Sequence, residues 1–148
     1  MMVIRTASVD DLPKMESEAR NFYASSPSLK SFDMQRFVLL WTSLLSGGTG
    51  IIFLLLDGEE VKGALGGVIY PDAYSPDLIA TEFFWWVNPK NRGRGLDLYY
   101  GFEEWAWQRK CQRIRMTHLC DLMPDGLKGL YESLGFKPVE INYEKELS

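Results

Sequence analysis

Two arginines and two glycines form the segment Arg92-Gly93-Arg94-Gly95, which lies between an apolar run and a helical pattern. The apolar run covers residues 78–87, and apolar residues recur at helical spacing over residues 96–107. Glycines let a ligand approach the backbone, and a helix N-terminus attracts anions through its amides and its dipole. Arginines add charge-assisted hydrogen bonds. The spacing predicts a phosphate-binding loop, although a solvated turn would have the same composition.

The loop lacks the features of two common nucleotide-binding motifs. The phosphate-binding loop of NTPases has a lysine and a hydroxyl residue after its last glycine, where this chain has Leu96 and Asp97. The dinucleotide-binding fingerprint needs three glycines, and here Gly93 and Gly95 are available. The loop alone therefore does not identify its anion.

Composition narrows the class of protein. The 148 residues suit a single domain, 1–148, and 46% of them are hydrophobic. The net charge of −4 argues against nucleic-acid binding, and the longest apolar run, residues 50–56, is too short to span a bilayer. The N-terminus lacks the apolar segment of a signal peptide, and Cys111 and Cys120 have no metal-binding spacing. We expect a soluble cytoplasmic protein with no metal, nucleic-acid or membrane partner.

The elements around the loop follow from hydrophobic periodicity and turn residues. Strands are expected at residues 3–7, 50–56, 61–70, 78–87, 113–120 and 136–143. Helices are expected at about residues 8–23, 33–47, 95–110 and 127–134, with Asp33 as an N-cap and Gly135 at a C-cap position. The order predicts an α/β (α+β) fold, a mixed sheet with helices on its faces.

This order resembles that of the GNAT superfamily of acyl-CoA-dependent N-acyltransferases. Residues 87–95 are similar to the family's coenzyme-A loop, Arg/Gln-x-x-Gly-x-Gly/Ala after a Val-x-Pro strand end. Residues 129–138 are similar to its C-terminal Leu-Tyr-x-x-x-Gly-Phe signature. The resemblance implies a mostly antiparallel, splayed sheet of six to seven strands flanked by helices. Its fourth and fifth strands would part to admit the pantetheine of coenzyme A.

The resemblance also implies a set of cofactor contacts. The end of the fourth strand would offer backbone hydrogen bonds to pantetheine near Trp85 and Val87. The pyrophosphate would lie against the backbone of the six residues Arg92, Gly93, Arg94, Gly95, Leu96 and Asp97. Asp97 departs from the family pattern, which has a small residue there, and at ~5 Å its charge would repel a phosphate by roughly 3 kcal/mol before salt screening. Either the neighbouring basic residues offset this repulsion, or Asp97 points away and caps the helix.

Two residues are candidates for proton transfer. Tyr131 occupies the position where many family members have a tyrosine beside the coenzyme-A sulfur, and a phenol can protonate a thiolate. Glu82 interrupts an apolar strand, so desolvation should raise its pKa towards the range of a general base. The alternatives are that Tyr131 is an aromatic of a short helix and that Glu82 pairs with an arginine. His118 is expected to be a hydrogen-bonded core or cleft residue rather than a base.

These features favour an N-acetyltransferase that uses acetyl-CoA as co-substrate. The acceptor would be a primary amine of a small molecule or protein, attacking the thioester directly in a ternary complex. Residues 24–32 and 71–77 would shape its site, with Asp72 and Asp77 giving an acidic mouth. The alternative is a catalytically silent acyl-CoA-binding or protein-interaction module on the same fold. The helix expected at residues 95–110 carries three apolar residues opposite its core stripe, Leu96, Tyr100 and Trp107. We expect this face to be covered either by a second copy in a homodimer or by the chain's own loops.

Overall fold

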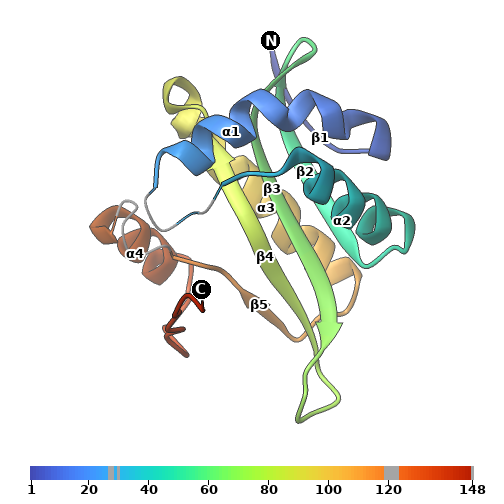
Figure 1. Cartoon of the computed structure of the whole chain (residues 1–148). Coiled ribbons are helices and arrows are strands. Elements are labelled where there is room, and N and C mark those ends of the chain that lie inside the picture. The colour runs from blue at the N-terminus through green and yellow to red at the C-terminus, as the bar shows by residue number, and fades with distance from the viewer. Residues whose placement is uncertain (27–28, 30, 119–123, 148) are drawn as a thin grey trace. The chain divides into compact units, whose positions relative to one another are not determined.

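The computed structural model describes residues 1–26, 29, 31–118 and 124–147, which form two compact units, Met1–Thr117 and His118–Ser148. The first unit contains a five-stranded sheet (Figure 1). In spatial order the strands are β1 (Met2–Thr6), β2 (Gly50–Asp57), β3 (Glu60–Pro71), β4 (Leu78–Val87) and β5 (Arg113–Arg115). Neighbouring strands are antiparallel except β4 and β5, which are parallel.

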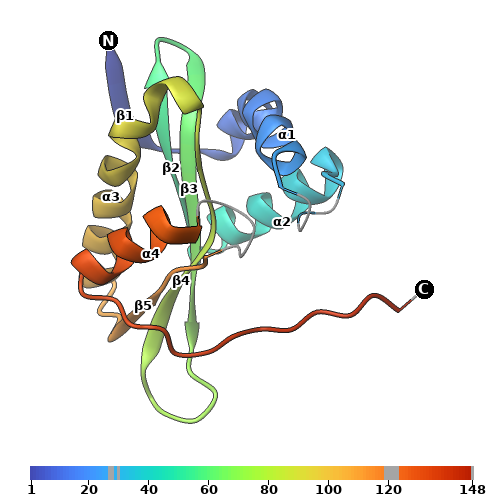
Figure 2. The same cartoon turned by 90° about the vertical axis from the view of Figure 1, so that its left-hand side faces the viewer.

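Helices cover both faces of this sheet. The 3₁₀ helix η1 (Val9–Met15), α1 (Glu16–Ala24) and α2 (Met34–Ser46) lie on one side, and α3 (Gly95–Gln108) lies on the other (Figure 2). A further 3₁₀ helix, η2 (Pro89–Arg94), joins β4 to α3. The predicted N-cap at Asp33 is confirmed, because its carboxylate accepts hydrogen bonds from the amides of Gln35 and Arg36 at 2.9 and 3.2 Å. None of the helices in the described part of the chain is both long and apolar enough to cross a bilayer.

The hydrophobic core beneath α1 and α2 explains why the helices dock there. Trp41 of α2 is buried with Ile52 and Leu54 of β2, and with Phe84 and Trp86 of β4. On the opposite face, the core stripe predicted for α3 contains Leu98, Tyr99, Phe102, Trp105 and Ala106. Four of these residues are buried as predicted, and Trp105 is half-buried. Trp107, on the other side of α3, is 71% exposed in the single chain. A side chain that a second copy covers in a dimer would be exposed in this way in one copy alone. The dimer stays a prediction.

The sheet has five strands rather than the predicted six to seven. Residues 136–143 form no strand, although Val139, Ile141 and Tyr143 alternate with polar residues. Alternation produces a strand where a neighbouring edge accepts its backbone hydrogen bonds, and these three apolar side chains are exposed instead. The predicted strand at 113–120 is shorter as well, since β5 ends at Arg115, and Cys120 lies outside the described residues.

The second unit contains α4 (Pro124–Ser133), close to the predicted helix at residues 127–134. Its predicted C-cap is confirmed, because Gly135 has a φ of 91°, in the left-handed region that glycine adopts without strain.

Packing between β3 and α3 leaves no room for a side chain at Gly67. A Cβ there would lie 2.2 Å from Cε1 of Phe102. We predict that Gly67→Ala lowers the free energy of unfolding by about 1–3 kcal/mol, the usual cost of overpacking a core. Urea denaturation measures this, with Gly93→Ala as control because a Cβ at Gly93 meets no atom within 4 Å. Equal stability of the two variants would show that Phe102 repacks without cost.

Candidate active site

A bulge in β4 sets the direction of Glu82. Gly66 of β3 is opposite Phe84, whereas the next residue, Gly67, is opposite Glu82, so Phe83 is an extra residue in β4. Phe83 and Phe84 consequently both pack on Trp41, with ring centroids 6.0 and 5.3 Å away. Glu82 shares the α3 face with Gly67. Bulges redirect side chains in this way, and in a regularly alternating strand Glu82 would lie on the same face as Phe84, towards α2.

The strands β4 and β5 separate at the same point. Among the described residues they pair at three positions, from Ile79 with Arg113 to Thr81 with Arg115. The remainder of β4, from Glu82 to Val87, extends beyond this ladder. Glu82 is therefore the first residue of β4 past its pairing with β5 in the described part of the chain, and the expected splay of the sheet stays a prediction.

Glu82 is buried at this junction. Its side chain is 6% exposed, and its Oε1 accepts a hydrogen bond from the amide of Thr117 at 3.0 Å. Burial raises the pKa of Glu82 from 4.5 to about 7, against the opposing effect of the Thr117 hydrogen bond. Within the described part of the chain no basic side chain forms an ion pair with Glu82, contrary to the alternative of an arginine partner. The carboxyl can therefore exchange a proton near neutral pH.

The predicted glycine loop is folded as the 3₁₀ helix η2. Its start is fixed by Pro89 and by Asn88, whose Oδ1 accepts a hydrogen bond from the amide of Lys90 at 3.0 Å. Gly95 adopts ordinary helical angles, with φ −61° and ψ −34°, so this position does not need glycine for its conformation. A Cβ on Gly95 would instead approach Cγ2 of Val87 to 3.2 Å. Glycine there allows α3 to begin close against the end of β4.

Side chains of the fourth strand hold this junction together. The indole Nε1 of Trp85 donates a hydrogen bond to the carbonyl of Gly95 at 3.2 Å, and the Trp85 ring lies 6.3 Å from that of Tyr99. Leu96 is half-buried at the start of the helix. The side chains of Trp85 and Val87 thus build the junction itself, and the expected backbone contacts of these residues with pantetheine stay a prediction.

Asp97 forms an ion pair within the predicted anion site. Its Oδ2 accepts a hydrogen bond from Nε of Arg94 at 2.7 Å, and both side chains are half exposed. The amide of Gly95 is also engaged, since it donates to the carbonyl of Arg92. The structure gives Asp97 an ion pair rather than a helix cap, and an anion bound here would compete with it for Arg94. Exposed pairs of this kind contribute about 0–1 kcal/mol, so the competition is weak.

Tyr131 belongs to the second unit, where the Leu-Tyr-x-x-x-Gly-Phe signature forms a C-terminal helix cap. The amide of Phe136 donates to the carbonyl of Tyr131 at 2.9 Å, and the amide of Gly135 donates to that of Glu132 at 3.1 Å. These two bonds define a Schellman motif. The rings of Tyr131 and Phe136 lie 5.5 Å apart, so the motif fixes the tyrosine relative to its own helix. His118, in the same unit, has a buried Nε2 that finds no hydrogen-bond partner among the described residues.

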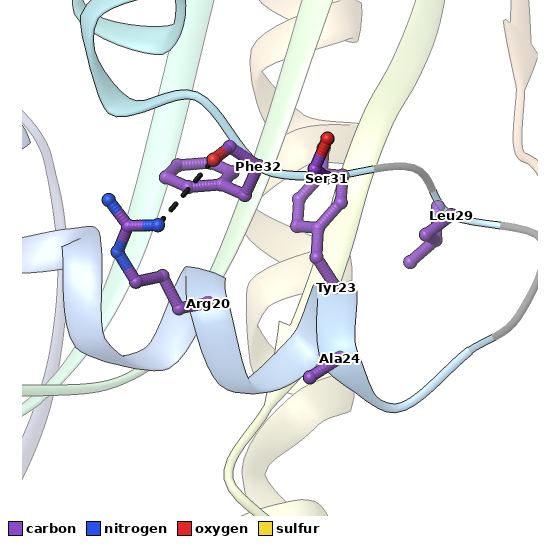
Figure 3. Close-up of a pocket in the computed structure, with 6 residues that line it drawn as sticks. All are labelled: Arg20, Tyr23, Ala24, Leu29, Ser31 and Phe32. Carbon is purple, nitrogen blue, oxygen red and sulfur yellow. Dashed lines mark hydrogen bonds between the residues drawn. The ribbon is translucent and has the colours of Figure 1, made fainter.

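A pocket of about 270 Å³ lies beside α1 (Figure 3). Tyr23 and Phe32 give it an aromatic lining. Arg20 closes one side, with its guanidinium 5.4 Å from the centre of the Phe32 ring and paired to Glu16 at 2.7 Å. The remaining lining residues are Ala24, Leu29 and Ser31.

The charge of the expected acidic mouth at residues 71–77 is partly compensated, because its two aspartates share one arginine. Asp72 and Asp77 lie 3.2 and 3.5 Å from the guanidinium of Arg113, which compensates much of their charge. The sequence places Arg113 more than 30 residues away, so the pairing depends on how β5 lies beside β4.

Several contacts at the site were missed by sequence reasoning. Thr117 contributes a backbone amide, which carries no sequence signal. The bulge at Phe83 has one signal, the Gly66-Gly67 pair in the facing strand, because glycines inside strands often mark bulges. Sequence reasoning gave no role to Asn88, which lies between Val87 and Pro89 and makes side-chain hydrogen bonds to Glu18 and to the amide of Lys90.

No protein-family model matches the sequence, and no curated protein matches it. Solved structures do match. A predicted acetyltransferase from Clostridium acetobutylicum, solved with acetyl-CoA, has a TM-score of 0.80 at 14% identity, over 99% of this chain and 96% of that one. An aminoglycoside acetyltransferase from an uncultured soil metagenomic sample, in complex with sisomicin, has a TM-score of 0.76 at 17% identity, over 99% and 97%. A transcriptional regulator from Bacillus halodurans C-125 has a TM-score of 0.77 at 22% identity, over 99% and 100%.

The titration of Glu82 gives the protein a characteristic pH dependence. Below pH 4.5 the carboxyl is protonated in the folded and unfolded states alike, so its burial costs little. Between pH 4.5 and about 7 only the unfolded state ionises, and stability falls as pH rises. We predict that Glu82→Gln gains about 3 kcal/mol over the wild type between pH 4.5 and pH 8.

Urea denaturation at several pH values measures this gap. The control is Glu104→Gln, which changes an exposed glutamate on α3 and should track the wild type throughout. A constant difference between Glu82→Gln and the wild type would contradict a raised pKa.

Proposed function

We propose that this chain, which has the GNAT fold, is an N-acetyltransferase that transfers the acetyl group of acetyl-CoA to a primary amine. The observation that carries the proposal is the position of Glu82. A buried carboxyl with a pKa of about 7 lies where β4 and β5 part, on the strand that leads to the basic loop. In this proposal a proton acceptor and an anion site lie on one continuous segment of chain.

Glu82 suits the removal of a proton from the amine. An amine attacks a thioester carbonyl through its lone pair, so the ammonium form must first lose a proton. A base with a pKa near 7 is ionised often enough to accept that proton and basic enough to hold it. The neutral nitrogen then bonds to the carbonyl carbon, the carbon–sulfur bond breaks, and the nitrogen loses its second proton, which balances the proton that the leaving thiolate takes up. In this proposal Glu82 accepts the proton directly or through one water.

The basic loop suits the pyrophosphate of acetyl-CoA. The N-terminus of α3 provides the positive end of a helix dipole, and Arg92 and Arg94 flank Gly93, where an added Cβ would meet no atom within 4 Å. The structural neighbour solved with acetyl-CoA supports this co-substrate. Asp97 lowers the affinity in this proposal but does not abolish it, since its partner Arg94 is exposed to solvent.

Tyr131 suits the last proton transfer. The thiolate that leaves the acetyl group needs a proton, and the phenol of Tyr131 can supply it. The Schellman cap supports this role because it fixes the tyrosine on its helix through two backbone hydrogen bonds.

The acceptor is proposed to be an amine of a small molecule or a protein. The aromatic pocket beside α1 supports this site, and the structural neighbour solved with sisomicin is an aminoglycoside acetyltransferase. Because Asp72 and Asp77 are paired with Arg113, the site is proposed to select by shape and aromatic contact more than by negative charge.

A catalytically silent acyl-CoA-binding or interaction module is the second candidate. The Arg94–Asp97 ion pair and the engaged amide of Gly95 favour it, because both occupy groups that an anion would use. Calorimetric titration with acetyl-CoA, followed by an assay of coenzyme-A release over a panel of primary amines, separates the two. Binding with release supports the enzyme, binding without release supports the module, and no binding contradicts both.

The basic loop can be tested by changing its charges in opposite directions. We predict that Arg92→Ala combined with Arg94→Ala weakens acetyl-CoA binding by about tenfold or more, through the loss of charge-assisted hydrogen bonds. Asp97→Ala should strengthen binding several-fold, because it removes a repelling charge and releases Arg94. Calorimetry measures both affinities. Weaker binding by Asp97→Ala would show that the carboxylate supports the site.

The role of Tyr131 can be tested by removing its hydroxyl. We predict that Tyr131→Phe lowers the rate of coenzyme-A release by about 100-fold, within the usual contribution of a general acid, while acetyl-CoA affinity changes little. Steady-state kinetics and calorimetry on the same sample give the two values. Wild-type turnover in the variant would remove Tyr131 from the mechanism.

A further inference from the structure

Asn88 is the most fully bonded residue at the start of the basic loop. Its backbone amide donates to the carbonyl of Lys62 at 2.7 Å, and its carbonyl accepts from the amide of Asn91 at 2.8 Å. Its side-chain Oδ1 accepts from the amide of Lys90 at 3.0 Å. The side-chain Nδ2 donates to Oε1 of Glu18, also at 3.0 Å. Four hydrogen bonds thus fix one residue between β3, η2 and α1.

Two of these bonds make the loop dependent on α1. The Asn88 amide group uses its oxygen to begin η2 and its nitrogen to bind Glu18. Because the amide group is planar, a bond at one end limits the orientation of the other. The bond to Glu18 is partly buried and has a charged acceptor, which makes it stronger than a neutral hydrogen bond. Glu18 therefore holds Asn88 in the orientation that caps η2.

The same helix α1 lines the pocket of Figure 3. Arg20, Tyr23 and Ala24 follow Glu18 within two turns and all contribute to the pocket. One helix therefore contacts the start of the basic loop through Glu18 and the pocket through the residues that follow. The hydrogen bond between Asn88 and Glu18 links the start of the loop to this helix.

We propose that Asn88 and Glu18 are positioning residues for the coenzyme-A loop, and that their hydrogen bond transmits occupancy of this loop to the pocket-lining helix α1. The inference rests on the proposed function, because it assumes that the loop binds the co-substrate. When acetyl-CoA binds, its pyrophosphate restrains the loop that η2 already forms, and the Asn88–Glu18 bond extends this restraint to α1.

The affinity for acetyl-CoA is the first measurement. Glu18→Ala removes the bond and should weaken binding by about tenfold, the effect expected for one lost hydrogen bond to a charged group. Glu18→Gln retains an acceptor oxygen for Asn88 and should bind within about twofold of the wild type. Ser17→Ala, an exposed neighbour on α1, is the matched control and should bind as the wild type does.

A reversed pair tests the bond itself. Asn88→Asp places a second carboxylate against Glu18 and should weaken binding by more than tenfold. Combining Asn88→Asp with Glu18→Gln restores a donor on α1 and an acceptor at position 88. Asn88→Asp combined with Glu18→Ala removes the same repulsion without supplying a donor, so higher affinity in the combination with Glu18→Gln reports the restored bond.

Hydrogen exchange measures the transmitted effect. Acetyl-CoA should slow amide exchange in α1 at least threefold in the wild type and in Glu18→Gln, and should leave α1 unchanged in Glu18→Ala at saturating ligand. A contact that merely stabilises the fold would slow exchange in α1 equally with and without acetyl-CoA. Thermal unfolding of each variant confirms that it is folded at the temperature of the experiment.

The outcomes separate this inference from the proposed function. If the wild type does not bind acetyl-CoA, the proposed function fails. If the wild type binds, but Glu18→Ala binds equally well and shows the same protection of α1, the function stands and the inference is overturned. Weakening in Glu18→Ala, recovery in the reversed pair and loss of protection in α1 together support it.

Discussion

The extra residue Phe83 in β4 is the constraint on which the site depends. It keeps Phe84 and Trp86 in the core beneath α2 while turning Glu82 to the opposite face. A carboxyl placed there is buried at the point where β4 and β5 stop pairing, and burial raises its pKa to about 7. Above that pH the carboxylate is ionised while it is buried, which lowers the stability of the fold. Groups with pKa values shifted in this way are typical of functional sites.

The end of the same strand fixes the basic loop that is proposed to bind an anion. Trp85 binds the carbonyl of Gly95, and Asn88 begins the 3₁₀ helix that leads into α3. The distance between base and basic loop is therefore set by one strand and by two side-chain contacts, rather than by a mobile loop. Asp97 works against anion binding by the loop, because its ion pair already occupies Arg94. A bound phosphate would replace one acidic partner of Arg94 by another.

Sequence patterns predicted the elements near the site well because their causes are local. The Asp33 cap, the core stripe of α3 and the left-handed Gly135 each depend on a few neighbouring residues. Features that depend on distant pairing were missed. Residues 136–143 alternate as a strand does, yet no strand forms there, and Arg113 compensates the charge of two aspartates far away in the chain. Glu82 was predicted from its apolar surroundings, whereas its direction required the register between β3 and β4.

The most direct test of the proposed role of Glu82 is the pH dependence of coenzyme-A release, measured for the wild type and Glu82→Gln with the fastest acceptor of an amine panel. We predict that the wild-type rate rises with pH through an apparent pKa near 7. For Glu82→Gln we predict a rate at least about 100-fold lower and without that inflection. An unchanged rate and an unchanged profile in Glu82→Gln, with acetyl-CoA still bound, would contradict the central role of this carboxyl.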